Sequence, residues 1–256
     1  MNHTSMRRRS RARQHGFTMI ELSVAILIAL FLLVGLYTIL QGTSHTSTNQ
    51  NLLAQLQDDE RVATTMMTDV IQSAGYFPDA ATNPFATALP AAGAFTTVGQ
   101  VVTGGANPSG TGGDIITVRF QTDPGDGVLN CLGTSNSTGG RHIFINTFSI
   151  NTQGQLVCEL DNSGNKVPLA SGIQSLQIFY GVSSASTLTN ATDGQVDAYL
   201  PASQMTATNW TNVYSVKMQI TFTNPLNGQP GQSPTITFSR VVGIMSRIGV
   251  NVVDYT

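Results

Sequence analysis

The architecture of this chain follows from residues 15–40, HGFTMIELSVAILIALFLLVGLYTIL. The apolar run begins at Phe17 and ends at Leu40, and about 20 apolar residues are enough for a helix to span a bilayer. One carboxylate, Glu21, lies inside this run. A lone charge at membrane depth is costly, so a residue of this kind is usually functional.

Basic residues are concentrated in front of the apolar run. Five of the 12 basic residues precede residue 16, and they are Arg7, Arg8, Arg9, Arg11 and Arg13. From Phe17 onward, seven basic residues face all 14 acidic ones, so the body of the protein is acidic. It lacks the basic surface that nucleic-acid binding needs, and we expect no nucleic-acid partner.

Three simple interpretations of the N-terminus each leave a feature unexplained. A cleaved secretory signal has a shorter apolar core, and residues 42–45 (GTSH) make a poor cleavage site after it. A plain membrane anchor explains the length of the run but not Glu21. A soluble core helix conflicts with Val24–Leu40, which contains no charge.

The motif R-x-R-x-x-G-F-T-M-I-E-L, residues 11–22, resembles the N-terminus of type IV pilins and of the pseudopilins of type II secretion. The resemblance implies that residues 1–16 are a leader peptide. A prepilin peptidase would cut after Gly16 on the cytoplasmic face and then N-methylate Phe17. Glu21 would become the fifth residue of the mature protein, where this family carries its signature glutamate.

A physical role for Glu21 follows from this processing. A buried carboxylate is tolerated when it is paired or protonated, and the α-ammonium of Phe17 is the available cation. In a growing fibre, Glu21 of one subunit can meet the ammonium of its neighbour, so we interpret Glu21 as a mark that sets the register of assembly and not as a catalytic acid. The alternative is an ion pair with the ammonium of the same chain, four residues away.

The predicted helix continues beyond the membrane. Residues 49–74 contain no Pro or Gly, and one face is apolar at helical spacing. Gly75 is the expected stop. Gly35, Gly42 and the Thr/Ser-rich residues 43–48 are weak helix formers, at which a break is conceivable. We therefore divide the chain into a transmembrane and assembly half of the helix (17–40), an amphipathic half (41–75) and a head (76–256).

The head reads as an antiparallel β-sheet. Short β-prone runs alternate with turn signals, and the runs are 114–121, 142–150, 156–160, 173–180, 213–223 and 235–248, with one further strand expected around 95–102. A long helix followed by strands predicts an α+β, pilin-like fold in which the helix packs on the sheet.

Cys131 and Cys158 are the only cysteines, and an even pair in an exported domain favours a disulfide. Closing this loop would stabilise the head by roughly 3.5 kcal/mol on the chain-entropy model.

The spacing of some carboxylates raises the question of calcium binding. Two acidic pairs are weak candidates for Ca²⁺, Asp123 with Asp126 and Asp193 with Asp197, but tight-turn chemistry accounts for both pairs. We expect no cofactor and no catalytic metal. None of the hydrolase, phosphate-binding or zinc-protease motifs occurs, so we expect that the chain is not an enzyme.

The head narrows the resemblance to the PilW-type minor pilins. Similar motifs lie at residues 56–77, 130–133, 156–158, 168–181 and 210–218. The resemblance implies a minor pilin that primes type IV pilus assembly and is incorporated at or near the pilus tip. The alternatives are a J-type minor pseudopilin of type II secretion and a membrane-anchored module that binds a ligand or an adhesin.

The same resemblance implies a location and partners. The arginines in front of the apolar run would stay cytoplasmic, which leaves the head in the periplasm before assembly and in the fibre or at its tip afterwards. The expected partners are other minor pilins, the major pilin, the prepilin peptidase, the inner membrane and a large tip adhesin.

We predict that the mature protein lacks residues 1–16 and begins with N-methyl-Phe17, as measured by intact-mass and N-terminal peptide mass spectrometry. Gly16→Ala should reduce cleavage strongly, because a larger residue at the cut hinders the peptidase. An intact leader in functional pili would contradict the prediction.

Overall fold

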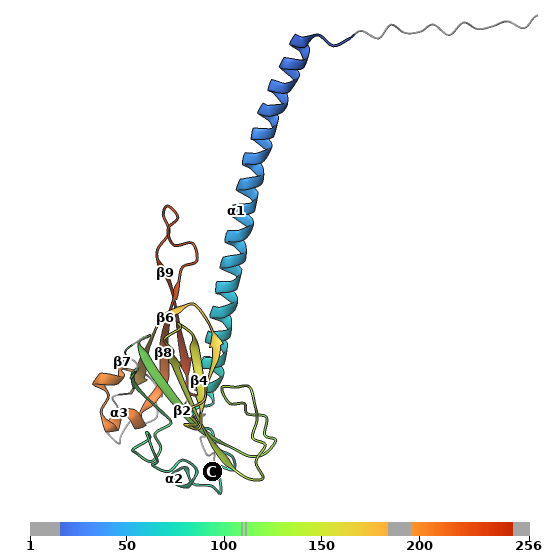
Figure 1. Cartoon of the computed structure of the whole chain (residues 1–256). Helices are drawn as coiled ribbons and strands as arrows, with labels where there is room; N and C mark the ends of the chain where they lie inside the picture. Colours follow the sequence, from blue (N-terminus) through green and yellow to red (C-terminus); the bar gives the residue numbers. More distant parts are fainter. Residues whose placement is uncertain (1–15, 109, 111, 184–195, 248–256) are drawn as a thin grey trace, which may run out of the picture. The chain divides into compact units, whose positions relative to one another are not determined.

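The computed structural model describes residues 16–108, 110, 112–183 and 196–247. The chain separates into two compact units, Met1–Asn51 and Leu52–Thr256. The elements, shown in Figure 1, are α1 (Met19–Gln72), α2 (Phe85–Ala88), β1 (Val102–Ala106), β2 (Asp114–Thr122), β3 (His142–Ile150), β4 (Leu156–Leu160), β5 (Lys166–Ala170), β6 (Ile173–Val182), β7 (Ala198–Pro201), η1 (Ala202–Gln204), α3 (Ala207–Thr211), β8 (Val213–Thr223) and β9 (Thr235–Gly243).

In the first unit, α1 exposes apolar side chains on all sides. Among the described residues, α1 is the one helix whose length and composition would allow it to cross a membrane. It contains no break at Gly35, Gly42 or residues 43–48. Threonine hydroxyls there bond to the carbonyl four residues earlier, as Thr43 Oγ1 does with Ile39 O at 2.8 Å, so these polar side chains are satisfied within the helix.

In the second unit, the last five turns of α1 bury one stripe of side chains. The stripe consists of Leu56, Ala63, Met67, Val70 and Ile71. It packs into a core shared with both sheets, so the predicted amphipathic face is the face that the helix buries. Gln57, Asp58, Arg61 and Asp69 are exposed on the other side.

Gly75 ends this helical stripe because no other residue fits. Its φ is +73°, and a Cβ placed there would lie 2.6 Å from both Ser246 Oγ and Val101 Cγ1. The Gly75 amide donates to Arg119 O at 2.9 Å, which joins the end of the helix to β2.

Two antiparallel sheets make up the head in the described residues. Their strand orders are β1-β2-β3-β4-β5 and β7-β6-β8-β9. The α+β prediction is confirmed, but the sequence predicted a single sheet and missed three strands. These are β1, β5 and β7, and each is an edge strand with Gly or Pro in it, where pairing decides more than propensity. The strand expected at 95–102 is wrong, because β1 begins only at Val102.

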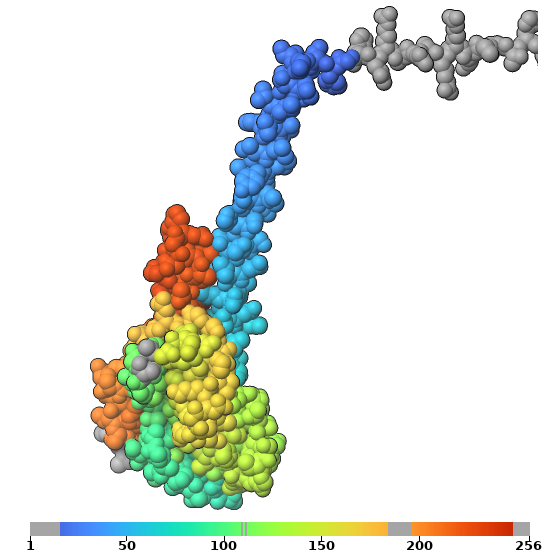
Figure 2. Space-filling model, viewed as in Figure 1, coloured from blue at the N-terminus to red at the C-terminus, as the bar shows by residue number. Residues whose placement is uncertain are grey.

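The two sheets meet at the start of β2. Gly113 forms a parallel bridge with Leu176 of β6, and Leu176 N donates to Gly112 O at 2.8 Å. Two residues further along β6, Ile178 N donates to the Asp114 carboxylate at 2.9 Å. A Cβ at Gly113 would lie 2.2 Å from Leu176 O, so only glycine allows the sheets this close. Beyond this point β6 pairs with β7 instead. In the space-filling view of Figure 2 the side chains cover these strands, and the green and yellow segments of the head lie against each other.

One buried arginine holds the chain between α1 and β1. The Arg119 side chain of β2 is 2% exposed, and its guanidinium donates to Gln100 O (2.8 Å), Pro90 O (2.5 Å) and Leu89 O (3.1 Å). The Phe95 ring lies 4.3 Å from the guanidinium carbon. Burial lowers the pKa of Arg119 to about 10, so the side chain is still charged at neutral pH.

The structure joins Cys131 and Cys158 in a disulfide across a separation of 27 residues. Both sulfur-bearing residues are fully buried, and Cys131 N donates to Asn146 Oδ1 at 2.8 Å. The bridge therefore fixes the long loop between β2 and β3 to β4 of the first sheet.

Arg119→Met should destabilise the head by about 2–4 kcal/mol, because two buried carbonyls (Gln100 and Leu89) and one partly buried carbonyl (Pro90) lose their donor. Urea unfolding of the full chain in detergent measures this loss through the fluorescence of Trp210, whose ring packs 4.7 Å from that of Tyr180. Arg240→Met, on an exposed strand, serves as the control and should keep the wild-type midpoint. Equal midpoints for both variants would contradict the role of Arg119.

Candidate processing and assembly site

The junction between Gly16 and Phe17 lies just outside the first helix. Gly16, Phe17 and Thr18 are not helical, and α1 begins at Met19. Thr18 caps the helix together with Glu21. Thr18 N and Thr18 Oγ1 both donate to Glu21 Oε2, at 3.1 and 2.8 Å, and Glu21 N donates back to Thr18 Oγ1 at 3.3 Å. This reciprocal arrangement is a capping box.

The cap satisfies hydrogen bonds of Glu21 but supplies no cation. From Gly16 to Asn51 the sequence contains no Lys or Arg, and Glu21 is its only acidic residue. A cation for this carboxylate must therefore come from outside this segment or from a new chain terminus. Cleavage before Phe17 would create such a terminus four residues away. The arrangement can thus hold a carboxylate oriented at the start of an apolar helix, ready for an ammonium group.

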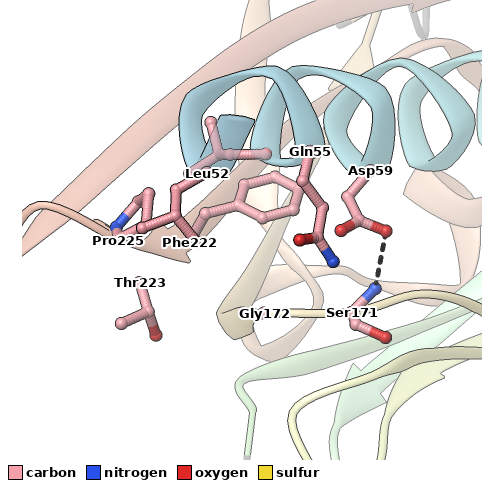
Figure 3. Close-up of a pocket in the computed structure, with 9 residues that line it drawn as sticks. Leu52, Gln55, Asp59, Ser171, Gly172, Phe222, Thr223 and Pro225 are labelled. Atoms are coloured by element: carbon pink, nitrogen blue, oxygen red, sulfur yellow. Dashed lines mark hydrogen bonds between the residues drawn. The ribbon is translucent and has the colours of Figure 1, made fainter. Parts of the chain in front are cut away.

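A second feature is a groove where α1 meets the turn between β5 and β6. Figure 3 shows the groove, whose volume is about 150 Å³ and whose lining includes Leu52, Gln55, Phe222 and Pro225. Asp59 on the helix accepts a hydrogen bond from Ser171 N at 3.2 Å. This bond fastens the helix to the turn, and we assign the groove a structural role.

Comparisons with protein families match two parts of this chain. Residues 11–37 match the prokaryotic N-terminal methylation motif, and residues 137–241 match type IV pilus-assembly protein W. The first match covers the junction and capping box. The second runs from just before β3 into β9. The chain is a PilW-family type IV pilin. A search of curated proteins gave no match.

The structure of this PilW-family pilin agrees with the predicted position of one site residue and adds a second residue that the sequence analysis did not name. Glu21 lies one helical turn from the junction of Gly16 and Phe17, as the spacing required. The role of Thr18 was missed in the sequence. The signal was there, since T-x-x-E before an apolar run is a capping-box pattern, here residues 18–21.

Two of the carboxylates considered for calcium, those of Asp123 and Asp126, make contacts within the fold. Asp126 accepts from Asp123 N at 2.9 Å and from Val128 N at 3.0 Å, and Asp123 pairs with Arg141 at 3.1 Å. The backbone of Asp197 donates to Val182 O, and Asp193 lies outside the described residues. Within the described part of the chain, no three His, Cys, Asp or Glu side chains gather around a common point.

Substitutions in this PilW-family pilin should separate the two functions of Glu21, which are charge pairing and capping of the helix. Glu21→Gln keeps a capping-box residue but loses the charge, Glu21→Ala loses both, and Thr18→Val loses the cap but keeps the charge. All three should be processed by the peptidase. We expect strongly reduced incorporation into sheared pili for both Glu21 variants and a smaller loss for Thr18→Val. Incorporation is measured by immunoblot of the pilus fraction against the membrane fraction.

Normal incorporation of Glu21→Gln would contradict the charge-pairing role. Thr18→Ser retains the hydroxyl and is the matched control, so it should behave as the wild type.

Proposed function

We propose that this chain is a minor pilin that primes type IV pilus assembly and is incorporated at or near the pilus tip. One observation carries the proposal, the presence of the methylation motif and the PilW match on a single chain. Pilin-family domains are structural and not catalytic, so we further propose that the chain is not an enzyme.

Processing prepares the chain for this role. Prepilin peptidase would cut after Gly16 and methylate Phe17, and the apolar helix would stay on the mature protein. Before assembly, the helix would hold the protein in the inner membrane with the head in the periplasm, because the arginines before residue 16 favour the cytoplasmic side. The two cysteines suit this oxidising compartment.

Extraction from the membrane is the physically demanding step of this function. The carboxylate of Glu21 and the ammonium of Phe17 would both lie at membrane depth, where unpaired charges are costly. Pairing Glu21 of one subunit with Phe17 of its neighbour removes both charges from an unpaired state at once. The pairing therefore favours docking in a single register and makes the association of the first subunits energetically favourable. A subunit at the very tip has no subunit ahead of it, so its own Glu21 would be more dispensable.

The neighbours in this complex would be other minor pilins, with the major pilin added behind them and a large adhesin in front. The acidic body of the chain is consistent with protein partners and not with nucleic acid.

Deletion of the gene tests the proposal. A strain that lacks this chain should lose most of its surface pili while the major pilin accumulates in the inner membrane, and the full-length chain supplied in trans should restore them. Immunogold labelling should place the chain at or near one end of each fibre.

Two outcomes would overturn it. Normal piliation combined with a loss of type II secretion would identify a J-type pseudopilin instead. A chain that stays in the membrane while piliation is normal would identify an anchored binding module.

A further inference from the structure

An apolar pocket lies at the C-terminal end of α1, within the second unit. It is lined by Gln72, Ser73, Tyr76, Val128, Met245 and Ser246, and its volume is about 380 Å³. Met245 is 56% exposed and Tyr76 is 38% exposed. Leu129, next in sequence to Val128, is 51% exposed. Several large apolar side chains at one place on a soluble head mark a binding surface more often than a lone exposed one does.

The walls of this pocket are fixed by the fold. Met245 N donates to Gln72 O at 3.2 Å, and Ser246 Oγ donates to Ala74 O at 2.7 Å. On the other side, the carbonyl of Tyr76 accepts from Gln121 N of β2 at 2.8 Å. A pocket that exists before binding loses little conformational entropy when a partner enters it.

Carboxylates lie near the side of the pocket that Tyr76 forms. The pKa of the Tyr76 hydroxyl is raised by burial and by the nearby Asp126, Asp123 and Asp79. Arg141 pairs with both Asp79 and Asp123, but it neutralises only one charge. Asp69 adds a further exposed carboxylate one turn before Gln72 on the helix. A further cation, Arg247, follows Ser246 of the lining, but it donates to Gly99 O at 2.5 Å and lies over the Phe85 ring.

We propose that this pocket is the docking site for another subunit of the pilus-assembly complex, which inserts an apolar side chain flanked by lysine or arginine. The inference rests on the proposed function, because it requires a partner in that complex. The apolar wall supplies burial, and the carboxylates around it select a basic rim and orient the encounter. A symmetric contact between two copies of this chain is disfavoured, because it would bring the same acidic surfaces together.

Photo-crosslinking in intact piliated cells tests the inference. A photoreactive phenylalanine analogue replaces Met245 in the full-length chain, and the crosslinked peptide is sequenced by mass spectrometry. We expect a crosslink to a different pilus subunit, at a segment with an apolar residue next to lysine or arginine. The control position is Gln153, exposed in the turn between β3 and β4, which should not give this product.

A charge variant tests the acidic rim. Asp69→Lys should lower the yield of the Met245 crosslink at least about five-fold, since it replaces attraction by repulsion at the edge of the site. Asp58→Lys changes the same charge on an exposed part of the helix near Arg61 and should leave the yield unchanged. The fluorescence of Trp210 verifies that each variant is folded.

The crosslinking experiment can fail independently of the deletion experiment that tests the proposed function. No crosslink from Met245, a crosslink to a second copy of this chain, or one to residues 248–256 of the same chain would overturn the docking site. Each of these results is obtained in whole cells, whether or not the chain enters fibres. The pilus counts of the deletion strain decide the proposed function independently.

Discussion

Burial of a single stripe on α1 is the constraint on which the head depends. Met67, Ile71 and Ala74 are fully buried, and they belong to one core cluster that also contains residues of both sheets. The two sheets are joined to each other by the bridge at Gly113 and by the hydrogen bond that the Asp114 carboxylate accepts from β6. The stripe of α1 and the two joined sheets therefore share one core.

The two halves of α1 follow opposite rules within one continuous helix. Before Asn51 its apolar side chains face outward in every direction, as in a helix whose solvent is lipid. After Leu52 its apolar side chains narrow to one stripe and its charged side chains return. Glu21 is the exception in the first half, and the capping box explains how its carboxylate is held in one orientation without a cation of its own.

How much was predictable depends on whether a signal is local. Short local motifs indicated three features, which are the junction at Gly16, the position of Glu21 and the end of the helix at Gly75. The central strands β2, β3, β6 and β8 have strong alternation or β-branched content and were predicted closely. The edge strands β1, β5 and β7 were not, because segments such as VTGGA in β1 and AYLP in β7 form strands only when a neighbouring strand has a free edge to pair with. The edge strand β9 was predicted, although it ends at Gly243 and not at residue 248. The pocket beside Tyr76 is lined by residues from three segments that are far apart in the sequence. No local sequence pattern predicts that these segments come together.

The manner in which Arg119 holds its loop has a consequence for how this head can diverge. All three acceptors of its guanidinium are main-chain carbonyls, at residues 89, 90 and 100. Carbonyls are the same whatever side chain the residue carries. These three hydrogen bonds therefore do not depend on which side chains residues 89, 90 and 100 carry. The exposed positions within residues 77–100 can acquire new side chains while the loop stays attached to the sheet, whereas the buried Phe95 ring packs on the guanidinium and is constrained. A head built in this way can change what it displays while its scaffold stays the same.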